Sequence, residues 1–343
     1  TIKRSRSHDY VSKEVINVRE NVGLIEVANF SKHEFKGPDA RKFLDHIMAG
    51  RLPKPGRISL SPMLSYRGKL CGDLTVACLD ENEFMVFGSG AAQEMHRRWF
   101  ESHLDKFNLS YSNRSDEYHG LSIAGPNSRK VLEKIVRDDV SNEKFKFRDS
   151  RRMFVGGVPA IINRISFTGE LGYEIYVAPH YQLKLYEELM EAGKEFNIKP
   201  FGGRALMSMR LEKNWGAWTL DYRPDFTAKE TGLDAFINWD KEFIGKESAQ
   251  KENSSNKLVP LIVETNEIDV TNNEAVLNGD QSIGYVTSGG FAHFVNKSVA
   301  FTFVDQKNIK SENKIQVEIN GDLFNCSIIK EPLYDPSGQK MRS

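Results

Sequence analysis

Three extended segments separated by two short turns occupy residues 57–90. Residues 58–66, 70–79 and 84–88 are rich in apolar and β-branched residues, and Arg67-Gly68 and Glu81-Asn82 lie between them. Turns this short join strands that run in opposite directions. The segment is therefore predicted to form an antiparallel meander, which excludes a sheet made wholly of parallel strands.

Further strands and helices alternate on both sides of this meander. Strands are expected at residues 22–27, 121–124, 159–167 and 173–177. Helices are expected after Gly37-Pro38-Asp39 with Asp39 as the cap, over 91–107 with Ala92, Met95, Trp99 and His103 on the buried stripe, after Gly125-Pro126-Asn127, over 181–196 and over 204–213. Hairpins mixed with helices in this way predict an α+β fold.

The last third of the chain has a different pattern. Residues 246–257 are almost entirely polar, which is typical of a linker. Short strands are expected at 258–263, 283–287, 299–304, 315–319 and 324–329, with Asn278-Gly279 and Asn320-Gly321 among the turns. This predicts a small barrel or compact sandwich. We therefore expect an α+β region of residues 1–250 with two lobes, the meander of residues 57–110 lying in the second, and a β domain of residues 257–343.

The charge balance and the cysteines exclude several classes of protein. Lys plus Arg and Asp plus Glu number 47 each, so no net charge draws the chain to nucleic acid or an anionic membrane. No apolar run is long enough to span a bilayer. Cys71, Cys78 and Cys326 form no C-x-x-C pair, which argues against a metal site and favours reduced thiols in a bacterial cytoplasm or another reducing compartment such as the mitochondrial matrix. The opening segment 1–13 lacks the apolar run of a signal peptide.

An aspartate enters an apolar strand directly after a glycine in Gly72-Asp73-Leu74-Thr75-Val76. A carboxylate on a buried strand is costly unless it is paired or used in chemistry. Asp73 is therefore a candidate acid–base group. The alternative is a turn-capping aspartate at a strand edge, because Asp next to Gly is common in turns.

A second candidate site lies in residues 166–175, where two glycines bracket Glu170 and Glu174 enters an apolar strand. A carboxylate there could accept hydrogen bonds from N–H donors of a ligand. The alternative is a glycine-rich hairpin with solvated acids, and Glu170 fits this alternative better.

A third candidate is the segment Gly202-Gly203-Arg204, which opens a helix whose free N–H groups favour an anion or a ring acceptor. Arg204 and Arg210 point about 120° apart, so they cannot both serve one small site directly, and for either a surface arginine with an ion-pair partner is the usual case.

Taken in order, these segments resemble a known family. Residues 72–76, residues 167–175, Gly203-Arg204-Ala205-Leu206 with Arg210-Leu211-Glu212, and residues 284–291 look like the glycine-cleavage T-protein (aminomethyltransferase) superfamily. Residues 61–64, 87–90, 120–126 and 210–213 are similar in detail to the C-terminal folate domain of dimethylglycine and sarcosine dehydrogenases. The resemblance covers about residues 18–336.

The resemblance implies a fold of two intertwined ferredoxin-like lobes plus a C-terminal β-barrel around a folate channel. It also implies that Asp73 lies beside the reactive folate nitrogens and that Glu174 and Arg204 hold the pterin. Gly172, Tyr173 and Leu74 fall in the same two motifs and are carried over as binding residues. Phe167 stands where the family often has tyrosine, so it is carried over only for stacking or packing.

The implied function is transfer of a one-carbon unit from an amine-derived iminium to tetrahydrofolate. The sequence has no G-x-G-x-x-G fingerprint after an N-terminal strand, so we expect no flavin in this chain. The chain starts at Thr1 without the flavin domain of those dehydrogenases, and we expect it to be the folate part of a longer or multi-part enzyme, with FAD in a partner domain or subunit. A stand-alone aminomethyltransferase and a non-catalytic folate-binding protein are the alternatives, and Asp73 argues against the second.

Overall fold

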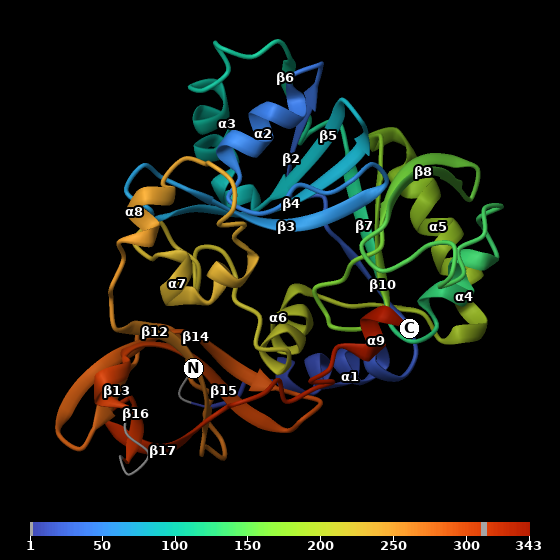
Figure 1. Ribbon diagram of the computed structural model, residues 1–343. Helices are drawn as coiled ribbons and strands as arrows, with labels where there is room; N and C mark the ends of the chain where they lie inside the picture. Colours follow the sequence, from blue (N-terminus) through green and yellow to red (C-terminus); the bar gives the residue numbers. More distant parts are fainter. Residues whose placement is uncertain (1–2, 310–313) are drawn as a thin grey trace.

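The computed structural model describes residues 3–309 and 314–343. It contains two sheets with helices on their outer faces and a separate C-terminal barrel (Figure 1). This confirms the predicted α+β fold, and the C-terminal unit is a closed barrel rather than a sandwich.

The first sheet has the strand order β11-β1-β7-β10-β9-β8. Its strands are β1 (Gly23–Glu26), β7 (His119–Ala124), β8 (Ser150–Val155), β9 (Val158–Asn163), β10 (Gly172–Val177) and β11 (Lys199–Pro200). Helices α4 (Ser128–Glu133) and α5 (Gln182–Ala192) cover one face, because their apolar side chains and alternate residues of β10 form one buried cluster.

The second sheet has the order β3-β4-β5-β2-β6 and contains the predicted meander. Its strands are β2 (Ser31–Lys36), β3 (Arg57–Leu64), β4 (Leu70–Asp80), β5 (Glu83–Gly88) and β6 (Ser110–Asn113). Helices α2 (Ala40–Ile47) and α3 (Gln93–Glu101) cover its outer face. All five strands lie between β1 and β7 in the chain, so the second lobe is inserted into the first, as the resemblance implied.

The inner faces of the two sheets pack on each other through a cluster that includes Ala77 of β4, Phe87 of β5, and Ile161 and Tyr176 of the first sheet. Helices α1 (Ser7–Glu20) and α6 (Gly203–Glu212) lie side by side below these sheets (Figure 1). Helix α7 (Ala228–Thr231) packs against the first strand of the barrel.

The barrel closes in the order β12-β15-β14-β13-β16-β17. Its strands are β12 (Asn256–Val263), β13 (Ala275–Asn278), β14 (Gln281–Ala292), β15 (Lys297–Asp305), β16 (Ile315–Ile319) and β17 (Asp322–Ile328), and α9 (Gln339–Arg342) follows them. Within the described ranges, no helix is long and apolar enough to cross a membrane, and the three cysteines are free.

Several predicted elements differ from the structure. The helix expected over 91–107 ends at Glu101 as α3, and it buries His96 and Phe100 rather than the stripe through Met95. Asp39 stands at the start of α2, but its carboxylate accepts from the Asn108 backbone N–H at 2.8 Å instead of capping the helix. Part of the predicted linker forms α8 (Lys246–Gln250). Helices α1, α7 and α9 and strands β2, β6, β8, β11 and β13 were not predicted. Thr1 and Ile2 of the opening segment lie outside the described residues.

Candidate functional site

Two strands from different sheets bring Asp73 and Glu174 to one space. Successive side chains of a strand point to opposite faces, so Asp73, Thr75 and Ala77 share one face of β4. Glu174 and Tyr176 share one face of β10 in the same way. Ala77 and Tyr176 both belong to the apolar cluster between the sheets. Asp73 and Glu174 therefore project from facing strands toward the space between the two sheets.

An aromatic pair connects β10 to β5, the strand next to β4. The rings of Phe87 and Tyr176 are stacked with centroids 4.6 Å apart. Phe87 lies opposite Thr75 in the register of β4 and β5, and the Tyr176 hydroxyl donates to Glu174 Oε2 at 2.8 Å. The stacked rings thus join β5, the neighbour of the strand that carries Asp73, to the strand of Glu174.

Asp73 has the properties of a proton acceptor that works near neutral pH. Its surface is partly accessible, and in the described part of the chain no cation pairs with its carboxylate. Burial raises the pKa of this carboxyl to about 7, with a small opposing effect from a hydrogen bond to its own backbone. A carboxyl whose pKa lies near the working pH can both take up and release a proton.

Glu174 is more deeply buried, with 8% of its surface exposed. Burial raises its pKa to about 7, against the hydrogen bond from Tyr176 and the positive charge of Lys32. Within the described residues, Oε1 of Glu174 receives no hydrogen bond, since Tyr176 donates to Oε2. The side chain therefore has acceptor capacity left for N–H donors of a ligand.

Lys32 was not among the predicted site residues. It lies on β2, opposite Phe87 in the register of β2 and β5, and none of its surface is exposed. Little in the sequence pointed to a buried lysine here, because β2 itself was not predicted and lysine is usually a surface residue. A lysine inside a short strand pattern, Ser31–Lys36, was the available signal.

The segment of residues 214–222 borders Asp73 from the side of the barrel. Tyr222 belongs to a cluster with Leu60 of β3, and the negative charge of Asp73 is one of the causes, after burial, that raise the pKa of Tyr222. The neighbouring Asp221 is fully buried and holds this segment. It accepts hydrogen bonds from Arg210 at 2.8 Å, the Ala217 N–H at 3.0 Å, Thr287 at 2.5 Å and Ser288 at 2.7 Å.

Arg210 is therefore a buried residue, and the expectation of a surface ion pair was wrong for it. It is 1% exposed and pairs with Asp221. Thr287 and Ser288 come from the barrel motif at residues 284–291, so this motif fixes the barrel to α6 and to the segment beside Asp73.

Arg204 lies elsewhere. Its side chain is exposed, and Nη1 donates to Ser7 Oγ at 2.7 Å on the side of α1. The N-terminus of α6 does bind an anion, but that anion belongs to this chain, because the Gly202 N–H donates to Glu14 Oε2 at 2.9 Å. Asp73 and Glu174 thus lie on the inner faces of the two sheets, whereas Arg204 does not.

The remaining predicted binding residues are spread over several surroundings. Tyr173 faces the helices on the other side of β10 and stacks on Phe145 at 5.8 Å. Leu74 likewise points into the cluster under α2 and α3. Phe167 is half-buried and stacks on Trp215 at 5.9 Å. Gly172 pairs with Ala124 of β7.

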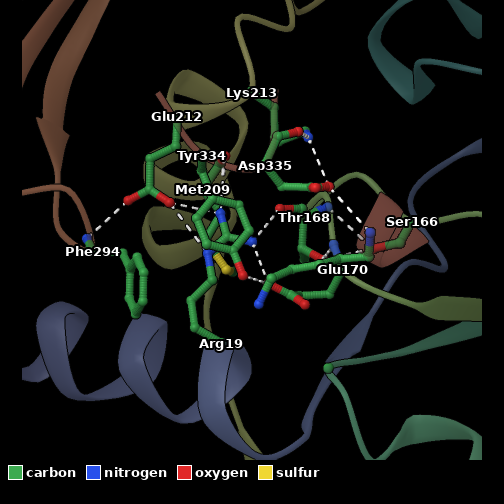
Figure 2. A network of polar contacts seen from close by, with 12 residues as sticks. Arg19, Ser166, Thr168, Glu170, Met209, Glu212, Lys213, Phe294, Tyr334 and Asp335 are labelled. Carbon is green, nitrogen blue, oxygen red and sulfur yellow. Dashed lines mark hydrogen bonds and ion pairs between the residues drawn. The ribbon is translucent and has the colours of Figure 1, made fainter. Parts of the chain in front are cut away.

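A buried ion network lies next to the loop that precedes β10 (Figure 2). Arg19 of α1 donates to Glu170 Oε1 at 2.9 Å, to the Thr168 carbonyl at 2.7 Å and to Glu212 Oε2 at 2.6 Å. Tyr334 donates to the same oxygen of Glu170. All three ion-paired side chains are at most 1% exposed, so the alternative of a solvated Glu170 was wrong.

The network also anchors the barrel and the C-terminal segment. Glu212 Oε1 accepts from the Phe294 N–H at 2.8 Å, and Lys213 donates to the Asp335 carbonyl at 2.6 Å. The loop of residues 166–171, which leads into β10 and Glu174, is therefore held by α1, α6 and the C-terminal segment together.

Two family models match the chain. The GCVT N-terminal domain matches residues 2–241, and the glycine cleavage T-protein C-terminal barrel domain matches residues 256–335.

Relatives of two kinds are similar over nearly the whole chain. Mitochondrial dimethylglycine dehydrogenase of Mus musculus is 34% identical over 341 residues, which are 97% of this chain and 39% of that protein. An aminomethyltransferase of Thermoanaerobacter pseudethanolicus is 29% identical over 330 residues, which are 94% of this chain and 89% of that protein. The chain therefore spans about two fifths of the length of the dehydrogenase.

A solved structure has the same fold. The glycine cleavage system aminomethyltransferase T from Bartonella henselae superposes with a TM-score of 0.86, covering 95% of this chain and 90% of that one at 23% identity.

Proposed function

The chain belongs to the glycine-cleavage T-protein family of folate-dependent aminomethyltransferases, and we propose that it captures the CH2 of an N-methyl-amine-derived iminium on tetrahydrofolate. In this proposal the chain is the folate part of an enzyme like dimethylglycine or sarcosine dehydrogenase. The flavin oxidation that makes the iminium occurs in a partner domain or subunit. The identity of 34% to dimethylglycine dehydrogenase supports this assignment.

One observation carries the proposal: two carboxyl groups with pKa values raised to about 7 project from facing strands toward one space that also holds an aromatic pair. A reduced pterin fits Glu174, because the ring offers adjacent N–H donors and Oε1 of Glu174 has no hydrogen bond within the described residues. Glu174 would hold the ring, and the Phe87–Tyr176 pair would line the space beside it. Arg204, Phe167, Tyr173, Gly172 and Leu74 remain proposed binding residues from the resemblance alone.

The bound folate supplies the two nitrogens that receive the carbon, with tetrahydrofolate and the iminium giving 5,10-methylenetetrahydrofolate, the free amine and one proton. Asp73 accepts a proton from the attacking nitrogen, and its negative charge stabilises the positive charge of the iminium in the transition state. The carboxyl then returns the proton to the departing amine or to water. Its partial accessibility permits that exchange.

A binding experiment and an activity experiment test this function. Calorimetry under anaerobic conditions should show tetrahydrofolate binding to a colourless protein, and a stoichiometric yellow flavin would contradict the expected cofactors. Formaldehyde premixed with N-methylglycine supplies the iminium without a flavin enzyme. The protein should then accelerate formation of methylenetetrahydrofolate above the uncatalysed background. Acceleration with an aminomethylated lipoyl carrier, and none with this iminium, would instead favour the stand-alone aminomethyltransferase.

A further inference from the structure

Lys32 carries a charged group into the protein interior beside the candidate site. Its side chain has no exposed surface, and its register partner is Phe87, whose ring stacks on Tyr176. The Lys32 ammonium lies 5.8 Å from the centre of the Tyr176 ring, and the Tyr176 hydroxyl donates to Glu174. The ammonium and the Glu174 carboxyl are therefore neighbours of the same aromatic side chain.

The hydrogen bonds of this ammonium leave its charge without an adjacent anion. Among the described residues, Lys32 donates to the carbonyl of Ala28 at 2.6 Å and to that of Ser115 at 3.5 Å. Both acceptors are neutral. A buried ammonium without a carboxylate in contact lowers the free energy of unfolding, so a lysine at this position destabilises the fold unless its charge serves the site.

The charged groups around the pair are few. Glu174 faces Tyr176 on its own strand and Lys32 from β2. Lys32 in turn is influenced by Glu26 of β1, Asp116 of the β6–β7 turn and Glu174. The charges of Glu26 and Asp116 raise the pKa of Lys32 more than that of Glu174 does, but both of these side chains are exposed, whereas Glu174 is buried.

We infer that Lys32 is a positioning residue whose buried ammonium keeps Glu174 ionised, so that Glu174 can accept N–H donors of the folate ring. This inference rests on the proposed function. Lys32 would not contact the ligand, because none of its surface is accessible. It would act through Glu174. The directions of the pKa shifts agree with it. Burial lowers the pKa of Lys32 to about 8, against the negative charges of Glu26, Asp116 and Glu174. Burial raises the pKa of Glu174, against the hydrogen bond from Tyr176 and then the charge of Lys32.

The alternative is a purely structural lysine that ties Ala28 to Ser115. Two variants separate these roles. Lys32→Met removes the charge and the hydrogen bonds, and Lys32→Gln removes the charge but keeps N–H donors for the two carbonyls. Lys36→Met is the matched control, because Lys36 lies on the same face of β2 but is itself exposed and pairs directly with Glu34 and Glu83.

The first measurement needs no ligand. The Glu174 carboxyl is titrated by 13C NMR in the free protein and assigned by its disappearance in Glu174→Gln. Its midpoint should rise by about one pH unit in Lys32→Gln and Lys32→Met, as expected for loss of a nearby opposite charge, and stay in place in Lys36→Met. In the wild-type protein the same signal should show a second inflection near pH 8, as Lys32 loses its proton. An unmoved midpoint in a folded Lys32 variant, or the absence of the second inflection, overturns the inference.

The second measurement is the affinity for tetrahydrofolate between about pH 5.5 and 9.5. If binding needs ionised Glu174, the Lys32 variants should bind about tenfold more weakly below pH 7, since one pKa unit is a factor of ten. The difference should vanish above about pH 9, where Glu174 is ionised in every variant. A structural lysine would give the same ratio at every pH, which contradicts the inference. A wild-type protein that binds no folate would refute the proposed function, while the NMR titration would still decide whether Lys32 controls Glu174.

Discussion

Tyr176 donates a hydrogen bond of 2.8 Å to Glu174, two residues earlier on the same strand. Both side chains face the space between the sheets, so the phenol orients the carboxyl and occupies Oε2. Oε1 can then accept a hydrogen bond from a ligand. The hydrogen bond lets two polar side chains share the inner face of a strand beside an otherwise apolar cluster.

Glu174→Gln should weaken tetrahydrofolate binding while leaving the fold intact. The amide keeps a carbonyl oxygen for Tyr176 but replaces a charged acceptor, and hydrogen bonds to charged groups contribute roughly 1.5–3 kcal/mol. Calorimetry should therefore show a loss of affinity of roughly 10- to 150-fold. Glu187→Gln on the exposed side of α5 is the control. Unchanged affinity in the folded variant would remove Glu174 from the site.

Asp73→Asn should slow one-carbon transfer far more than it weakens folate binding. The amide has nearly the same shape but little basicity, and a positioned proton acceptor typically contributes about 10²–10⁴-fold to rate. Methylenetetrahydrofolate and formaldehyde are measured together at saturating folate, and in a complete flavoenzyme the uncaptured carbon should appear as formaldehyde. Transfer at the wild-type rate would exclude Asp73 as the proton acceptor.

The fold could be predicted where local patterns decide it. The meander followed from turns at Arg67-Gly68 and Glu81-Asn82, which act over a few residues. Helix α1 was not predicted, because Val11, Val15 and Val18 are its few buried apolar residues among polar ones. These residues pack against α6 and the edge of the first sheet, and a sequence pattern does not contain the partner surface.

The candidate site was predictable to a smaller extent. Asp73 and Glu174 stood out because each interrupts an apolar strand. Their placement on facing sides of one interface depends on two sheets packing face to face, which no single segment encodes. Lys32 becomes an interior residue only through that packing, and Glu170 and Arg210 become buried only because ion-pair partners from distant segments reach them.

The same substitution of Asp73 should stabilise the protein at alkaline pH. The pKa of this carboxyl is about 7 in the folded protein, above its ordinary value, so the folded state binds the proton more tightly than the unfolded chain. The folded protein therefore loses stability as pH rises from about 4 to 7, and the full cost is present above pH 7. Asp73→Asn removes this cost, so the free energy of unfolding above pH 7 should rise by about 1–3 kcal/mol. Its melting temperature should exceed that of wild type by a few degrees at pH 8 and match it near pH 4. A lower melting temperature at pH 8 would contradict the raised pKa.

Arg19→Met should strongly destabilise the protein. The variant leaves Glu170 and Glu212 buried without their cation, and breaking a buried ion pair from one side costs about 3–5 kcal/mol. Thermal and urea denaturation measure the loss. Arg97→Met is the matched control, because Arg97 also pairs with two glutamates, Glu94 and Glu101, but at the surface, where such pairs contribute less than about 1 kcal/mol.

A triple variant separates the charge from the shape of this network. Adding Glu170→Gln and Glu212→Gln to Arg19→Met removes both uncompensated charges, while the new amides can still accept from Tyr334 and from the Phe294 N–H. Most of the lost stability should return, since neutral replacements of a buried ion network are often tolerated. Because the network holds the loop that leads into β10, folate affinity should recover together with stability. A triple variant that is no more stable than Arg19→Met would show that the packing of the arginine stem, rather than its charge, supports the loop.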